Sequence, residues 1–361
     1  MKKNSYLSLG VMSGTSNDGI DISLIQSDGK NKLKILGSMY VKYNNKLTKD
    51  LNDLTASIKS NGINSSKIID LQERITISYI HAIKKFINSS NAKIDLISLH
   101  GQTIFHDPDK KISIQLCNAN LIKAEFNCQI IYDFRQNDLR NGGEGAPLVP
   151  IFHNLINKHL SLSGTNAYLN IGGISNITII KNSKIVSAFD TGPGMSILND
   201  YVYYKKKKFY DKAGNDSSKG IYDKNLINKL LNNSFFKKKP PKSLDKSYFN
   251  KTEFLKLNYY DACASIVEFT VECIRIGIAQ SKYKIDNLIL MGGGVKNNYL
   301  IRRIKDKLNI NVLNAEELGI DEDFIEAQAF AYLGIRCVKK LPITFPQTTG
   351  ANKPVSGGKI I

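Results

Sequence analysis

The sequence has no run of eighteen consecutive apolar residues, so it predicts no transmembrane helix. The opening stretch "MKKNSYLSLGVMSG" holds only a short apolar run broken by polar residues, which indicates a first β-strand rather than a signal peptide. The few cysteines are odd in number and form no CxxC pair: Cys117, Cys128, Cys263, Cys273 and Cys337. This usage favours a reduced, cytoplasmic protein with buried thiols over a disulfide framework.

Acidic residues are scarce relative to basic ones, since 32 Asp and Glu against 50 Lys and Arg give a net charge of +18. Such a charge suggests nucleic-acid binding as one function. A solvated lysine-rich surface is the stronger interpretation, because Lys, Asn and Ile are abundant throughout and the lysine runs at 204–210 and 236–242 flank predicted helices and loops. We therefore expect neither a nucleic acid nor a membrane as a partner.

What is present is an alternation of strand and helix patterns. A chain of 361 residues with 42% apolar content favours two domains. Residues 5–43 predict three strands around a glycine loop and a turn, and residues 46–90 and 147–160 have helical spacing. The buried strand "IDLISLHG" is predicted to end at its glycine, and helices dominate beyond residue 195. These patterns predict an α/β fold with several short sheets.

The middle of the chain repeats the plan of its beginning. "NAYLNIGGISNITII", a turn and "IVSAFD" predict strand, glycine-rich loop, strand, turn and strand, as residues 5–43 do. A duplication, with one loop from each half facing a cleft, explains this similarity economically. A chance likeness between two hairpins explains it as well.

Glycine loops follow predicted strands at residues 10–19, 172–176, 192–194 and 292–294. Backbone N–H groups in such loops can bind phosphate, and hydroxyl side chains accompany them at Ser13, Thr15, Ser16, Ser175 and Thr191. Neither GxxxxGK[ST] nor a GxGxxG that opens a helix occurs. A P-loop and a Rossmann dinucleotide site are therefore both disfavoured.

Asp190 is the strongest acidic candidate, because it ends a predicted strand immediately before "TGPGM". An acid in that place can act as a general base, or it can simply cap the turn. Asp18 and Asp21 could bind hydroxyls or water around Mg²⁺, although Asp18-Gly19 is also an ordinary turn dipeptide. Glu326 lies among apolar residues of a predicted helix, where it is either buried with a partner or exposed to solvent. Asp133 and Asp138 complete the acidic candidates.

His100, Gln102 and His106 lie in "SLHGQTIFHDP", which we predict to be a loop after the buried strand. They either offer hydrogen bonds to a sugar or nucleotide or stabilise the loop, and they are too sparsely accompanied to predict a metal site. Arg135, in "DFRQNDLRNGGEGAPLVP", could hold a carboxylate through two hydrogen bonds, or it could pair with Asp133.

Taken together, these stretches resemble the anhydro-N-acetylmuramic acid kinase family. The resemblance runs from end to end through "GVMSGTSNDGID", "LHGQTIFHDP", "DFRQNDLRNGGEGAPLVP", "NIGGISNIT", "FDTGPG", "MGGGVKNNYL", "EAQAFAYL" and "TGANKP". It implies two duplicated actin-like, ribonuclease H-like domains that close over ATP in a cleft. We expect one domain at 1–145 and the other at 146–339, with the segment from about 340 to 361 a candidate to pack back on the first.

The resemblance also implies a reaction: hydrolytic opening of a 1,6-anhydro amino sugar and transfer of the γ-phosphoryl group of ATP to O6. Mg²⁺ is expected with ATP rather than on protein ligands. Asp190 would activate the water, and the sugar would contact Thr15, Asp18, His100, Gln102, Arg135 and Glu326. The nucleotide would be bound by Gly14, Thr15, Ser16, Asn17, Asp18, Gly19, Ile20, Asp21, Gly172, Gly173, Gly292, Gly293 and Gly294. The sequence leaves a homodimer open.

Some positions depart from the family's pattern. Met195 replaces an Asn after "FDTGPG", and a thioether cannot make an amide's hydrogen bonds. Leu244, Asp245, Lys246 and Ser247 replace Thr, Gly, Arg and Glu, while Arg140 and Glu144 stand where smaller or amide residues are usual. These departures keep open a non-catalytic sugar- or nucleotide-binding relative, and a kinase for another sugar.

Overall fold

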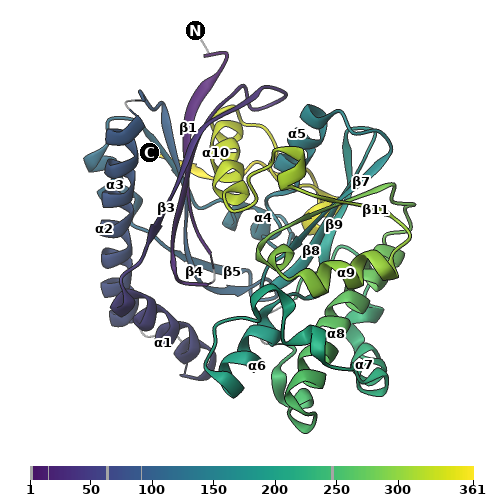
Figure 1. The fold of residues 1–361 in the computed structure, drawn as a ribbon. Coiled ribbons are helices and arrows are strands. Elements are labelled where there is room, and N and C mark those ends of the chain that lie inside the picture. Colours follow the sequence, from purple (N-terminus) through teal and green to yellow (C-terminus); the bar gives the residue numbers. More distant parts are fainter. Residues whose placement is uncertain (1–2, 15, 62–64, 91, 245–247) are drawn as a thin grey trace. The chain divides into compact units, whose positions relative to one another are not determined.

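The computed structural model describes residues 3–14, 16–61, 65–90, 92–244 and 248–361 (Figure 1). Its strands are β1 (Tyr6–Ser13), β2 (Gly19–Ser27), β3 (Leu33–Lys42), β4 (Leu96–Asp107), β5 (Ile112–Leu116), β6 (Gln129–Tyr132), β7 (Thr165–Ile171), β8 (Ile174–Lys181), β9 (Lys184–Pro193), β10 (Asn287–Met291), β11 (Asn311–Asn314) and β12 (Lys359–Ile360). Its α-helices are α1 (Asn45–Asn61), α2 (Ser65–Ser90), α3 (Ala119–Glu125), α4 (Gln136–Arg140), α5 (Pro150–Leu160), α6 (Ser196–Lys206), α7 (Lys224–Leu231), α8 (Tyr259–Gln280), α9 (Asn298–Lys307), α10 (Ile325–Val338) and α11 (Pro346–Thr349). Short 3₁₀ helices include η3 (Ser234–Lys237) and η5 (Gly293–Lys296). No helix in these described ranges is long and apolar enough to cross a membrane.

By its internal contacts the chain divides into two compact units. The first unit comprises residues 1–155 and 324–361, and the second comprises residues 156–323. These units overlap the predicted domains at 1–145 and 146–339 but assign residues 146–155 and 324–339, and with the latter the whole of α10, to the first unit. The C-terminal strand β12 pairs with β6 of the first unit.

The first unit contains a sheet in the order β12-β6-β4-β1-β2-β3, with β5 paired to β4. Strands β1, β2 and β3 are antiparallel neighbours, whereas β4 runs parallel to β1 and β6 parallel to β4. The three antiparallel strands arise from the glycine loop and turn that the sequence predicts over residues 5–43.

The second unit contains a sheet in the order β11-β10-β7-β8-β9. Here β7, β8 and β9 are antiparallel neighbours, and β10 and β11 continue the sheet parallel to β7. The first sheet has the same plan. Its first three strands are antiparallel neighbours, and two further strands, β4 and β6, continue the sheet in parallel from the edge of its first strand. The shared order and directions confirm the predicted α/β class of two duplicated actin-like sheets.

Two glycines bring helix α10 onto the first sheet. A Cβ at Gly10 would stand 1.9 Å from the carbonyl oxygen of Ala327, and one at Gly334 would stand 1.7 Å from Oγ of Ser98. Larger residues at either place would force α10 away from β1 and β4. The close approach fixes the first turn of α10, and Glu326 within it, against the sheet.

Strand β4 corrects one sequence prediction. It does not end at Gly101 but continues to Asp107, so His100, Gln102 and His106 lie in a strand and not in a loop. Residues beyond Gly101 pair with β5, a long-range partner that local patterns do not reveal. His100 is an extra residue where the β1–β4 register shifts, and such a bulge re-aims a side chain.

Candidate functional site

The loop between β1 and β2 is held by hydrogen bonds from a buried side chain of β4. Gln102, fully buried, donates from Nε2 to the carbonyl oxygen of Gly14 and to Oδ1 of Asn17, both over 2.8 Å. Asn17 has a positive φ of 58° and donates in turn to Asn52. Gln102 and Asn17 thus support the loop backbone, an arrangement that leaves the loop's outer residues to face solvent.

The outer residues of this loop present side-chain oxygen atoms to solvent. Asp18 and Ser16 are exposed, and Oγ of Ser16 donates to Oδ1 of Asp18 over 2.5 Å. Thr15 lies outside the described residues. Ile20, by contrast, points into the core of the first unit, and Asp21 is half-buried in β2. The predicted nucleotide contacts of Ile20 can therefore involve only its backbone.

His100, Arg135 and Glu326 gather in the first unit. Nη2 of Arg135 lies 2.8 Å from Nε2 of His100, and its Nη1 donates over 2.8 Å to the carbonyl oxygen of Gly145. His100 stacks on Phe330 of α10, with ring centroids 4.5 Å apart. Glu326 in the first turn of α10 is near enough for its charge to act on Arg135. Residues remote in sequence thus place a cationic and an acidic group within electrostatic range of each other.

Burial shifts the ionisation of all three groups. It holds the pKa of His100 well below its usual range, and the charge of Arg135 acts in the same direction. Burial lowers the pKa of Arg135 to about 10, against the opposing effect of Glu326 and Asp138, so the guanidinium stays charged at neutral pH. Burial also raises the pKa of Glu326, while Arg135 lowers it. Near neutral pH the cluster thus offers a neutral imidazole beside a fixed positive charge.

Asp133 and Asp138 have partners that give them structural roles. Asp133 pairs with Lys359 of β12 over 2.8 Å rather than with Arg135. Asp138 is buried and accepts hydrogen bonds from the backbone of Gly145 and from the hydroxyls of Thr344 and Thr349. Sequence reasoning did not find this junction, because nothing local links an aspartate to threonines some 200 residues away.

Asp190 lies in β9, three residues before the strand ends at Pro193 rather than at its end as predicted. It is half-buried, and its Oδ2 accepts a hydrogen bond of 2.8 Å from the backbone N–H of Leu244. Its own N–H donates to the carbonyl oxygen of Lys242 over 2.9 Å. The carboxylate is therefore oriented by segment 240–244.

The glycine loops of the second unit interlock. The N–H of Gly194 donates to the carbonyl oxygen of Gly173, and that of Met195 donates to Gly172. A Cβ at Gly194 would stand 2.3 Å from the oxygen of Gly172, so only glycine fits there. Thr191 is likewise structural, since its hydroxyl donates to the carbonyl oxygen of Ser175.

The third glycine run follows β10. Gly292 has a φ of 84° and, like Gly294, has no room for a side chain. A Cβ on Gly293 would meet no atom within 4 Å, so this glycine borders open space. Asn297 caps helix α9 by accepting from the N–H of Leu300. Gly293 is therefore the member of the run that a nucleotide could approach.

The departures at 195 and 244 retain the backbone contacts described above. Met195 precedes α6 without a side-chain cap and packs its thioether against the core of the second unit. Leu244 meets Asp190 through its backbone N–H, which every residue except proline supplies. Residues 245–247 lie outside the described residues.

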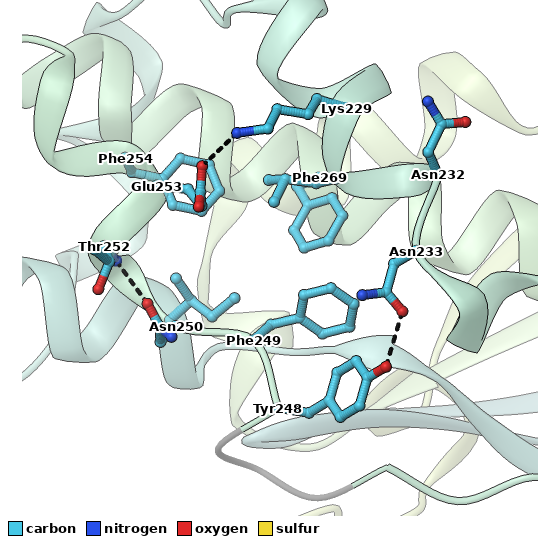
Figure 2. Close-up of a pocket in the computed structure, with 12 residues that line it drawn as sticks. Lys229, Asn232, Asn233, Tyr248, Phe249, Asn250, Thr252, Glu253, Phe254 and Phe269 are labelled. Carbon is cyan, nitrogen blue, oxygen red and sulfur yellow. Dashed lines mark hydrogen bonds and ion pairs between the residues drawn. The ribbon is translucent and has the colours of Figure 1, made fainter.

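A cavity of about 520 Å³ opens in the second unit (Figure 2). Aromatic rings form part of its wall, while Lys229 pairs with Glu253 and Tyr248 donates to Asn233 at its rim. It is lined by Ile197, Lys229, Leu230, Asn232, Asn233, Tyr248, Phe249, Asn250, Thr252, Glu253, Phe254 and Phe269. None of the predicted site residues that the structure describes lines this cavity. Among the described residues, no group of three His, Cys, Asp or Glu could hold a metal ion.

Both units thus carry the same arrangement of strands, a duplicated α/β sheet with a glycine loop after the first strand of each copy. The sequence model of the family "Anhydro-N-acetylmuramic acid kinase" matches residues 6–361. The chain therefore belongs to the anhydro-N-acetylmuramic acid kinase family. Relatives with that name are 37% identical in Pelagibacter ubique (99% of this chain, 98% of the relative), 33% in Methylorubrum populi (98% of each) and 34% in Methylobacterium nodulans (97% and 98%).

Proposed function

We propose that this protein is an ATP-dependent kinase that opens 1,6-anhydro-N-acetylmuramic acid with water and phosphorylates O6. The products are N-acetylmuramic acid 6-phosphate and ADP, and the reaction belongs to the recycling of cell-wall peptidoglycan. The observation that carries the proposal is membership of the kinase family over residues 6–361. Both substrates are small molecules, and we assign the reaction to the cytoplasm.

Asp190 acts as the general base in this proposal. Its carboxylate takes a proton from water while the water oxygen bonds to the anomeric carbon. The bond between that carbon and O6 breaks, and O6 takes the γ-phosphoryl group as ADP leaves. The N–H of Leu244 donates to Oδ2 and thereby orients the carboxylate for this proton transfer.

The sugar carboxylate is assigned to Arg135. The guanidinium is positively charged at neutral pH and already fixed by Gly145 and His100, so little side-chain entropy is lost when an anion binds. Glu326, whose charge acts on Arg135, is assigned to a sugar or anhydro oxygen. Burial raises the pKa of Glu326, and its carboxyl oxygens can accept hydrogen bonds from sugar hydroxyls.

Mg·ATP is assigned to the glycine loops. Mg²⁺ prefers oxygen ligands, and the exposed carboxylate of Asp18, beside the hydroxyl of Ser16, could bind water molecules around an ion that ATP brings. When bound with ATP, the ion neutralises charge on the phosphates. The backbone of Gly14, Gly172, Gly173 and Gly293 offers close approach without side chains.

The experiment is mass spectrometry of the product formed in ¹⁸O-water with ATP and Mg²⁺. The heavy oxygen is expected at the anomeric carbon and not in the phosphate, and Asp190→Asn is expected to abolish product. Asp200→Asn, on the exposed side of α6, is the matched control and should retain activity. Sugar binding in calorimetry without product at saturating ATP would instead identify a non-catalytic relative, and turnover of another sugar in an acceptor panel would identify a different kinase.

A further inference from the structure

Lys242 is buried in a chain whose other lysines mostly face solvent. Only 5% of its surface is exposed. Its Nζ donates to the carbonyl oxygen of Phe235 over 3.1 Å and to Oε1 of Gln280 over 2.8 Å, and it lies 4.2 Å from the centroid of the Phe235 ring. An ammonium has three donors and no acceptor, so two oxygens and a ring face satisfy it.

The surroundings keep this amine charged near neutral pH. Burial lowers the pKa of Lys242 to about 8, helped by Lys238, whereas Cys273 of α8 and Asp190 of β9 act in the opposite direction. The burial cost is thus offset by oriented oxygens and by the nearby carboxylate of Asp190. A neutral side chain of the same length would leave the two oxygens without their donor.

The ammonium ties its segment to two other elements of the second unit. Phe235 belongs to η3, and Gln280 is the last residue of α8. Gln280 also donates from Nε2 to the carbonyl oxygen of Phe236, which links the same two elements a second time. The position of segment 240–244 is therefore fixed from inside the unit.

The same segment contacts Asp190 on two sides. The carbonyl oxygen of Lys242 accepts from the backbone N–H of Asp190, and the N–H of Leu244 donates to Oδ2 of its carboxylate. A shift of segment 240–244 would therefore disturb two hydrogen bonds of Asp190, one at its backbone N–H and one at its carboxylate. Among the residues that the structure describes, Lys242 is the lysine whose side chain is buried.

We propose that Lys242 is a positioning residue for Asp190: its buried ammonium fixes segment 240–244, whose backbone orients the Asp190 carboxylate. The inference rests on the proposed role of Asp190 as the base. It adds the residue that keeps the base in place. Lys242 acts only through segment 240–244 and itself touches no reacting atom.

The test compares Lys242→Met, Lys242→Arg and Lys239→Met in the full-length protein. Lys242→Met keeps the side-chain length but removes the donors, and misplacement of the base should lower kcat roughly 10- to 100-fold. The KM for ATP should change less than about threefold, because the contacts of Lys242 named above involve no residue assigned to the nucleotide. Lys242→Arg should recover part of kcat, and Lys239→Met, an exposed neighbour, should match the wild type.

A double-variant cycle separates positioning from a general loss of structure. In the Asp190→Asn background, Lys242→Met should lower the residual rate no further, because the group it positions is already absent. If that background has no residual rate, the split between kcat and the KM for ATP decides. A kcat of Lys242→Met equal to that of Lys239→Met, or a loss that only follows the fraction of unfolded protein, would overturn the inference.

Gln280→Leu provides the second variant should Lys242→Met fail to fold. It removes one acceptor of the ammonium and leaves the lysine in place, so a smaller loss of kcat at unchanged KM for ATP is expected. A kcat equal to the wild type in a folded Gln280→Leu protein would then count against the inference. Wild-type activity in Asp190→Asn would overturn the assigned role of Asp190, and the absence of product from the wild type would overturn the proposed function. Both outcomes are distinct from each result for Lys242.

Discussion

Arg135 donates from Nη2 to Nε2 of His100 over 2.8 Å in the first unit. Because a guanidinium can only donate, Nε2 must be the acceptor and the proton of the neutral ring lies on Nδ1. The low pKa of the buried His100 agrees with this state. The pair therefore fixes the guanidinium without neutralising it, so the positive charge remains for an anionic ligand.

The first prediction concerns Arg135→Lys. A lysine cannot reach both Gly145 and His100 while holding a carboxylate through two bonds. We expect the KM for the anhydro sugar to rise about 10- to 100-fold, as the loss of a hydrogen bond to a charged group implies. Steady-state kinetics with varied sugar measures it, and Arg140→Lys on the exposed end of α4 is the control. A thermal midpoint that falls while the KM stays unchanged would make Arg135 purely structural.

The second prediction concerns Asp138→Asn. Three donors converge on the Asp138 carboxylate, and an amide presents an NH₂ group to at least one of them. We expect a loss of about 1.5–3 kcal/mol in the free energy of unfolding of the first unit. Urea unfolding measures this loss. Asp109→Asn, at an exposed position, should leave the transition unchanged, and equal midpoints for the two variants would contradict the junction.

The repeated sheet could be predicted from sequence because its first three strands are local. Two short apolar strands, a loop of Gly with small polar residues and a tight turn determine each antiparallel set without long-range information. The end of β4 could not be predicted in this way. Gly101 is typical of a strand end, yet pairing with β5 continues the strand, and that pairing depends on the tertiary fold.

The candidate site was predictable only in part. Asp190 and the glycine loops stand out by their place at predicted strand ends. The pairing of Arg135 with His100 joins residues 35 apart in sequence, and no local pattern reveals it. Lys242 gave no signal, because a lysine in a lysine-rich chain looks like surface until its burial is seen.

The third prediction concerns pH and His153 of α5. Burial lowers the pKa of His153 to about 3, below its unfolded value of about 6.5. The unfolded state therefore binds the proton first, and the stability that neutral His153 contributes is present above about pH 6.5 and lost as the pH falls toward 3. We expect a slope of at most about 1.4 kcal/mol per pH unit from this group.

Urea unfolding at several pH values between 4 and 7 measures that slope. His153→Gln should flatten it, whereas His81→Gln, at an exposed position of α2, should not. Equal slopes for wild type and His153→Gln would show that other groups cause the acid dependence.

The fourth prediction distinguishes support from contact at Gln102. Nε2 of Gln102 already bonds to Gly14 and Asn17, so Gln102→Leu should release the loop after β1 rather than remove a ligand contact. Because that loop is assigned to the phosphates, we expect the KM for ATP to rise by more than about fivefold, with a smaller rise for the sugar. This range corresponds to the typical net worth of about 1 kcal/mol per hydrogen bond. Gln26→Leu, exposed on β2, is the control. A rise confined to the KM for the sugar would instead make Gln102 a direct substrate contact, as its place in the sequence motif first suggested.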